Sequence, residues 1–334
     1  MLAHLSRHCS IVGIGLMLAA VAGSDARAQM SAPLVGLIAG ENTGRGEIRA
    51  VLGVLGASSI QAPMRLPRGV SRVHLAPTGG WALVQQRGKA PGVVTFQGSV
   101  PSAVQTIADA APSPDLVSFS PLGRSAGLLA SSSVIQVLTG LDATPRVAFE
   151  VNFFDTSGVK KIAVSDDGQL LAVLTAAGQV YMLSNSTAPQ FAYAGSPSLG
   201  MAFLPNQATV VIADAGNGAI HLARIVNGAP VLQPVTGSLS VASGETLVEA
   251  SRDGASAFVV ASGDTSACRV ELATGGMQSM TLPAVATRLD RLRDGESFVF
   301  SAEPGHSAWF LTARDSGLQA VFAAAASTAE VSRQ

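Results

Sequence analysis

The segment IAVSDDGQLLAVL, Ile162–Leu174, is the clearest copy of a phrase that occurs six times in the chain. Each copy has a short apolar run, a small turn and a second apolar run. The turn positions are 44, 45, 39, 47 and 41 residues apart; they are Gly79, Gly123, Gly168, Gln207, Gly254 and Gly295. A repeat of about 43 residues built from short strands is typical of a β-propeller with one four-stranded blade per repeat.

The repeat around Gly168 predicts four strands, namely Lys161–Val164, Leu170–Leu174, Gln179–Leu183 and Phe191–Ala194. An Asp-Gly pair suits the first turn, because glycine accepts a positive φ and aspartate can hydrogen-bond its own backbone. We therefore expect Asp167, Asp253 and Asp294 to form turns. The apolar runs are nearly continuous, which indicates strands buried on both faces between neighbouring blades.

The two ends of the chain predict how the ring closes. The N-terminal copy has second, third and fourth strands at Leu34–Ala39, Glu47–Leu55 and Ile60–Leu66 but no first strand. The last repeat, Leu289–Ala323, already contains four strands and leaves Ser327–Val331 spare. Because an open ring would expose two strand edges, the C-terminal segment is expected to supply the missing strand. The sequence thus predicts an all-β fold, a β-propeller of seven four-stranded blades, with six blades as the alternative.

The first 28 residues have the pattern of an export signal. The apolar run Ile11–Gly23 has 13 residues, fewer than the roughly 20 that a membrane-spanning helix needs. Ala26-Arg27-Ala28 matches a small-residue cleavage site, so Gln29 is the expected mature N-terminus, with an uncleaved anchor as the alternative. Residues 29–334 are then expected to form a single propeller domain, periplasmic or secreted, with no membrane span.

Charge and cysteine content exclude several classes of protein. Cleavage removes Arg7, Arg27 and Asp25, so 19 of the 21 basic and 21 of the 22 acidic residues remain, a net charge of −2. This balance lacks the concentrated basic face that nucleic-acid binding requires. Hydrophobic residues make up 48% of the chain, ample for a folded core. Cys268 is the one cysteine left, so no intramolecular disulfide forms, and its apolar strand predicts burial. We expect a monomer.

Short phrases in the repeats resemble known propeller families. SDDG from Ser165, SRDG from Ser251 and SPLG from Ser120 resemble the S-P-D-G turn of YVTN, TolB-like and cytochrome-d1-like repeats. The stretch Val210–Ile225 resembles an NHL-type repeat through Asp214, Asn217, Gly218 and Ile220. The Trp-Asp mark of WD40 repeats is absent, and Gly-His occurs once, at Gly305-His306, without it. The resemblance covers most of residues 29–334, implies a bacterial secreted propeller, and carries no catalytic residue to this chain.

Candidate ligand residues lie on the connections between second and third strands and between fourth and first strands, the face that propeller sites more often use. They are Asp115, Asp214, Asn217, Glu245, Asp264, Glu303 and His306. Oxygen ligands from separate blades could bind Ca²⁺ without a local sequence pattern, so Ca²⁺ stays open. Three isolated histidines and one cysteine predict no transition metal, and we expect no other cofactor. We expect these charges to be exposed and solvated rather than gathered in one site, so alanine at each acidic position should shift stability by no more than ~0.5 kcal/mol.

No nucleophile elbow, Walker loop or dinucleotide fingerprint occurs in a suitable context, and a single cysteine excludes C-x-x-C-H haem attachment. We therefore interpret the protein as a non-enzymatic binding or protein-interaction module of the cell envelope, whose partner is an envelope or extracellular protein or a small ligand. The alternative is an enzyme of the lactonase-like or quinoprotein-like propeller type with a central metal or cofactor. A structural envelope protein is a third interpretation. Convergence of four or more candidate residues in one funnel would favour the enzyme.

Overall fold

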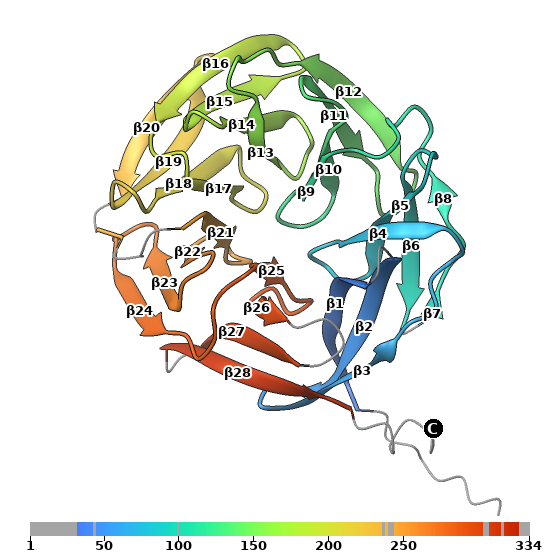
Figure 1. The fold of residues 1–334 in the computed structure, drawn as a ribbon. Helices are drawn as coiled ribbons and strands as arrows, with labels where there is room; N and C mark the ends of the chain where they lie inside the picture. Colours follow the sequence, from blue (N-terminus) through green and yellow to red (C-terminus); the bar gives the residue numbers. More distant parts are fainter. Residues whose placement is uncertain are drawn as a thin grey trace, which may run out of the picture. The chain divides into compact units, whose positions relative to one another are not determined.

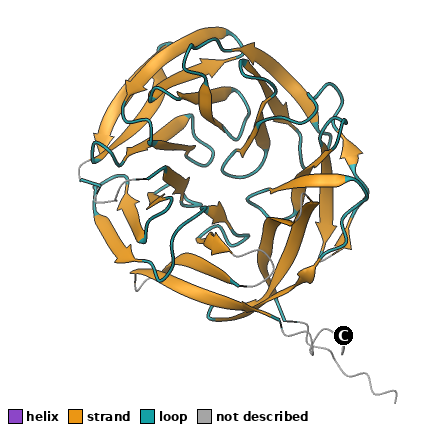
Figure 2. Ribbon diagram, viewed as in Figure 1, coloured by secondary structure: helices purple, strands orange, loops and turns teal. Residues whose placement is uncertain are grey.

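The structure is a computed structural model that describes residues 32–42, 45–98, 100–235, 238–239, 244–302, 307–314 and 317–326. These residues form strands, turns and loops, with no helix among them (Figure 2). Within this part of the chain there is accordingly no helix that could span a membrane. The predicted export signal, residues 1–28, and the segment Ser327–Val331 lie outside the described residues.

Antiparallel sheets follow one another around a common centre, and each sheet forms a propeller blade (Figure 1). Four consecutive repeats give regular four-stranded blades. The first two are β9 (Leu116–Phe119), β10 (Ser125–Leu129), β11 (Val134–Thr139) and β12 (Arg146–Asn152), then β13 (Val159–Val164), β14 (Leu170–Thr175), β15 (Gln179–Ser184) and β16 (Thr187–Ala194). The next two are β17 (Gly200–Phe203), β18 (Thr209–Asp214), β19 (Ala219–Val226) and β20 (Ala229–Val235), then β21 (Thr246–Ala250), β22 (Ser256–Ala261), β23 (Ser266–Glu271) and β24 (Met277–Thr281).

The remaining blades lie next to the chain ends. One consists of β4 (Val70–Leu75), β5 (Trp81–Gln86) and β6 (Gly92–Gln97), with two short strands, β7 (Val100–Pro101) and β8 (Gln105–Thr106), both paired to β6. The last repeat gives β25 (Asp290–Arg291), β26 (Ser297–Ala302), β27 (Ala308–Arg314) and β28 (Gly317–Ala325). The N-terminal blade has three strands, β1 (Leu34–Asn42), β2 (Arg45–Val54) and β3 (Ala57–Pro63). The described residues thus form seven blades, as predicted.

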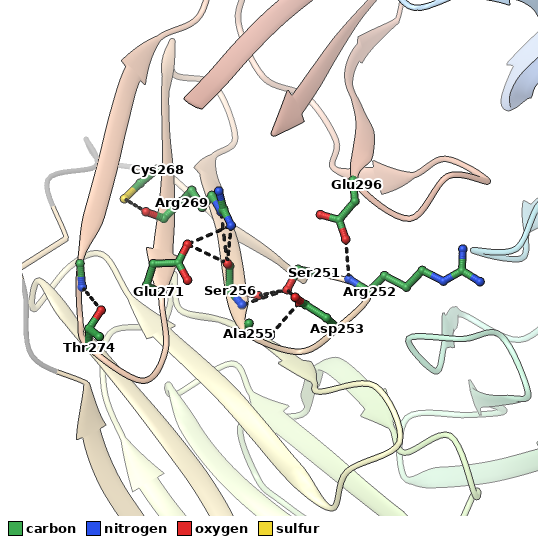
Figure 3. A network of polar contacts seen from close by, with 11 residues as sticks. Ser251, Arg252, Asp253, Ala255, Ser256, Cys268, Arg269, Glu271, Thr274 and Glu296 are labelled. Atoms are coloured by element: carbon green, nitrogen blue, oxygen red, sulfur yellow. Dashed lines mark hydrogen bonds and ion pairs between the residues drawn. The ribbon is translucent and has the colours of Figure 1, made fainter. Parts of the chain in front are cut away.

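Local hydrogen bonds explain the repeated turn between first and second strands (Figure 3). The Asp253 carboxylate accepts the Ser251 hydroxyl at 2.6 Å and the backbone N–H of Ala255 at 2.9 Å. Gly254 follows with φ 72°, a left-handed conformation that glycine adopts without a steric penalty. The turn-forming role predicted for Asp253 is confirmed, and carboxylate contacts of the same kind are made by Asp167 and Asp294.

Apolar clusters form between neighbouring blades. Ala172 and Leu174 of β14 pack with Val210 and Ile212 of β18. Every residue of β22 is buried, and so are all but the first of β14. The predicted burial of these strands on both faces is confirmed. Cys268 of β23 is also buried, as predicted.

The direction of β1 follows from its neighbours at each end. Leu34 lines the same hollow as Pro77 and Arg293, which follow the ends of first strands. Five residues later, the Ala39 carbonyl accepts a hydrogen bond from Arg288 Nη1 at 2.7 Å, and Arg288 precedes the first strand β25. β1 therefore runs in the direction of a second strand, as the sequence predicted.

The C-terminal strand closes the ring, but on the other edge of this blade from the one expected. Residues 324–325 of β28 pair in parallel with residues 59–60 of β3, so the sheet order is β1-β2-β3-β28. Closure of the ring by the C-terminal part of the chain is therefore confirmed, whereas Ser327–Val331, the segment expected to supply a missing first strand, lies outside the described residues and stays a prediction. Residues 37–39 of β1 line the central channel themselves. Apolar clusters on both sides of the N-terminal blade complete the ring.

Candidate functional site

The central channel contains a cavity of about 280 Å³ that all the first strands and β1 line. One position of the repeat contributes to this wall in every copy. It lies five residues before the turn position and is occupied by His74, Ser118, Ala163, Ala202, Glu249 and Asp290. The two carboxylates come from β21 and β25, in adjacent blades. The wall is therefore small or apolar over three consecutive blades and charged over the next two.

The following repeat position is apolar in five copies and charged in the sixth; its residues are Leu75, Phe119, Val164, Phe203, Ala250 and Arg291. The Arg291 side chain is only 3% exposed. Its Nη2 lies 3.1 Å from Oε2 of Glu249 and donates to the Ala250 carbonyl. The guanidinium stacks over Phe298, 5.6 Å from the ring centroid. Nε and Nη1 have no hydrogen-bond partner among the described residues.

Glu249 is the carboxyl group of this pair. Burial raises its pKa; the positive charge of Arg291 acts in the opposite direction, and the negative charge of Asp290 adds to the rise. A carboxyl group with a raised pKa retains its proton to higher pH and can exchange it closer to neutrality. Glu249 therefore has the electrostatic setting of a group that could transfer a proton inside the channel.

Other polar side chains complete the charged part of the wall. Arg288 forms an ion pair with Asp290. His74 Nε2 lies 3.3 Å from the Gln85 side-chain nitrogen. Burial lowers the pKa of His74 to about 4, with the charge of Arg72 acting in the same direction and that of Asp290 opposing it. His74 is therefore a neutral hydrogen-bonding group at pH 7 and adds no charge to the channel.

The channel opens at the end where first strands begin, into a hollow of about 360 Å³ that Lys161 and Glu249 help to line. Lys161 of β13 reaches β21, where its Nζ lies 2.8 Å from Glu245 Oε1 and 2.8 Å from the Thr246 carbonyl. Burial lowers the pKa of Lys161, while the hydrogen bond and charge of Glu245 oppose the change. The structure thus places the candidate Glu245 in an ion pair beside this opening.

Asp214 is fully buried at the end of β18 and accepts hydrogen bonds from three residues. Ser196 donates its backbone N–H at 2.9 Å and its hydroxyl at 2.5 Å, Asn217 donates its side-chain amide at 2.7 Å, and the Tyr193 hydroxyl lies at 3.1 Å. A Cβ on Gly195 would lie 2.1 Å from the carboxylate, so only glycine allows this approach. Burial alone would raise the pKa of Asp214, but the bonds from Ser196, Asn217 and Tyr193 outweigh it and lower the pKa. The expectation that Asp214 is exposed is wrong.

The other candidates lie apart from one another. Asp115 is exposed. Asp264 accepts the backbone N–H of Thr265 at 2.7 Å. Glu303 and His306 lie outside the described residues. Among the predicted candidates that the structure describes, it thus brings together Asp214 and Asn217 alone, and none lines the channel cavity. In the same part of the chain, no group of three or more His, Cys, Asp or Glu side chains is arranged to hold a metal ion.

Sequence reasoning concentrated on the connections and missed the charged residues of the first strands. The signal that could have found them is the alignment of the six copies on their turn position. In that alignment Glu249 and Asp290 share a column with alanine and serine, while Arg291 is the one charged residue in an apolar column. A charge at a position that sister repeats fill with apolar residues indicates a local role that packing does not require.

Comparisons with known proteins identify the fold but no family. No protein-family model and no curated protein matches the chain. Similar solved structures include a functionally unknown protein from Desulfotomaculum acetoxidans, at 13% identity and a TM-score of 0.60 over 88% of this chain and 99% of the other. The periplasmic gluconolactonase PpgL of Pseudomonas aeruginosa has 16% identity and a TM-score of 0.57 over 88% and 98%. Hydrazine synthase of Kuenenia stuttgartiensis has 11% identity and a TM-score of 0.54 over 82% and 89%. At these identities the similarity shows a β-propeller fold alone.

Proposed function

We propose that the chain is an exported β-propeller of the cell envelope that binds a small ligand in its central channel. The supporting observation is the cavity of about 280 Å³ whose wall combines apolar residues with the charged groups Glu249, Asp290 and Arg291. Small-molecule sites are typically concave and mostly apolar, with a few polar groups that orient the ligand. Export is supported by the apolar run Ile11–Gly23 and the Ala26-Arg27-Ala28 site.

Equilibrium dialysis tests this function. Residues 29–334 are dialysed against the low-molecular-weight fraction of an envelope extract, and enriched compounds are identified by mass spectrometry. The matched control is Ser118→Trp, which fills the channel from a wall position outside the apolar clusters. We expect a compound enriched by the unaltered chain and lost with Ser118→Trp. Absence of any enriched compound, or equal enrichment by both proteins, would contradict a channel ligand and favour a protein partner on an outer face.

A second candidate function is hydrolysis of a lactone or related ester, and the setting of Glu249 favours it. Its carboxyl group lines the channel and has a raised pKa. Perturbed carboxyl groups in clefts are frequent general acids or bases. Because the similar structure PpgL is a gluconolactonase, the first substrate to test is gluconolactone. Proton release by the unaltered chain, abolished in Glu249→Gln, is the expected result if the protein is such an enzyme. Equal rates for both proteins would exclude this role of Glu249.

A further inference from the structure

Arg291 is a buried cation with unused hydrogen-bonding capacity. Its side chain is 3% exposed, and two of its three guanidinium nitrogens, Nε and Nη1, lack a partner among the described residues. Phe298 gives the cation a contact with its ring, 5.6 Å from Cζ to the centroid, but no described group accepts a hydrogen bond from Nε or Nη1. Buried polar groups without partners are costly and rare, so each calls for a physical explanation.

The surroundings of Arg291 at the exit of the channel are basic. A hollow of about 530 Å³ opens where the first strands end, and Arg291 lines both this hollow and the channel cavity. Arg252 and Arg293 also line the hollow, and no carboxylate does. Both are exposed and form no ion pair within the described part of the chain, and Figure 3 shows the Arg252 guanidinium extended away from its turn.

Acidic side chains around this exit already accept hydrogen bonds, among them Asp166, which accepts the backbone N–H of Leu122 in the wall of the hollow at 2.7 Å. The Asp294 carboxylate accepts the Ser297 hydroxyl at 2.6 Å, and the Glu296 carboxylate accepts the backbone N–H of Arg252 at 3.2 Å. Within the channel, Glu249 pairs with Arg291, and Asp290 pairs with Arg288. Three arginines therefore line one hollow, and within the described part of the chain only Arg291 among them has an acidic partner.

From this arrangement we propose that the exit of the channel binds the oxyanion of a small acid, a carboxylate or a phosphate. Arg291 donates from the base of the site through Nε and Nη1, and Arg252 and Arg293 hold the anion from the rim. Guanidinium groups match the geometry and charge of both anions and form shorter, stronger hydrogen bonds with them than with neutral acceptors. This inference rests on the proposed ligand binding in the channel and specifies the chemistry of that ligand.

The test is isothermal titration calorimetry of residues 29–334 with inorganic phosphate and, separately, with succinate. We expect at least one of the two to bind, with an affinity that falls as salt is added. Arg252→Ala and Arg293→Ala should each weaken binding about three- to tenfold. Arg224→Ala is the matched control, because it removes the same charge from an exposed position of β19, and it should leave the affinity unchanged.

Arg291 itself needs a variant that folds. Arg291→Leu alone would leave the half-buried Glu249 without its cationic partner. The double variant Glu249→Ala with Arg291→Leu instead installs residues that sister copies carry at the same two positions, as in Ala202 and Leu75. Replacing a buried ion pair by apolar residues of fitting size is often neutral for stability. We expect this variant to fold with an unchanged circular dichroism spectrum and to lose anion binding.

Two results would overturn the anion site. One is that neither probe binds the unaltered chain at up to about 10 mM. The other is that Arg252→Ala, Arg293→Ala and the double variant all bind as the unaltered chain does. If dialysis still recovers a neutral compound whose binding Ser118→Trp abolishes, the anion site fails while the channel function stands. If dialysis recovers nothing and the anions do not bind, both fail.

Discussion

Replacement of Asp214 by alanine should destabilise the protein by about 3 kcal/mol. The carboxylate is fully buried and accepts two bonds from Ser196, at 2.5 and 2.9 Å, and two from Asn217, at 2.7 and 3.3 Å. A hydrogen bond to a charged group contributes about 1.5–3 kcal/mol, and an orphaned buried donor costs a similar amount. Asn217 is exposed, so water can replace its lost partner, whereas Ser196 is half-buried and loses two bonds. The two Ser196 bonds, partly compensated by water, account for the estimate.

The measurement is urea unfolding of the unaltered chain, Asp214→Ala and Asp214→Asn at pH 7. Asparagine keeps the shape and one acceptor but loses the charge, so it should cost about half as much. Asp115→Ala is the control, because Asp115 is exposed and should shift stability by no more than ~0.5 kcal/mol. The pKa of Asp214 lies below its ordinary 3.8, so its contribution is complete above about pH 4 and is lost as pH falls further. A cost below about 1 kcal/mol for Asp214→Ala would refute the reasoning.

Three further predictions concern His74, the C-terminal strand and export. The pKa of His74 is about 4 in the folded protein, against an ordinary value of 6.5. Between these pH values the unfolded chain therefore binds a proton at His74 that the folded chain does not. The free energy of unfolding should fall by up to about 3 kcal/mol as the pH drops from 6.5 to 4. Urea unfolding of His74→Gln should show a weaker acid dependence, and an identical one would contradict the cause given. Deletion of residues 324–334 should lower the melting temperature and promote aggregation, because it exposes the edge of β3. Deletion of residues 327–334 is the control, because it keeps the described pairing. Equal melting curves for the two truncated chains would argue against closure by β28. N-terminal sequencing of exported protein should begin at Gln29, and a chain that retains Met1 would exclude cleavage.

The blade architecture was predictable from sequence because it depends on local chemistry. The turn at Ser251–Gly254 needs a residue that accepts positive φ and a carboxylate that bonds the next backbone N–H, and both are visible as adjacent letters. The apolar runs on either side of the turn are recognisable as strands because each is short and is bounded by turn residues. For the same reason, β13 to β16 begin or end within a few residues of the predicted bounds.

Closure and the channel were harder because they depend on contacts between distant residues. The two-residue pairing of β28 with β3 joins positions about 265 residues apart, and nothing local distinguishes an inner from an outer edge. Asp214 illustrates the same limit within one motif. Its D-x-x-N-G pattern suggested a ligand-binding connection. The burial of Asp214 instead depends on the backbone of Ser196, which lies in the connection from the preceding blade.

The Glu249–Arg291 pair is the feature that packing alone does not explain. Three sister copies have alanine or serine at the position of Glu249, and all five others have an apolar residue at the position of Arg291, so a blade can form without a charge at either position. A buried ion pair contributes little net stability, because desolvation offsets much of the attraction between its members. In this pair the cost of desolvation is offset even less, because two nitrogens of Arg291 lack hydrogen-bond partners among the described residues. Arg252 and Arg293 add further positive charge at the rim. A ligand that brings an oxyanion to this exit would supply the missing acceptors. We therefore expect the ligand site at the first-strand ends of the propeller.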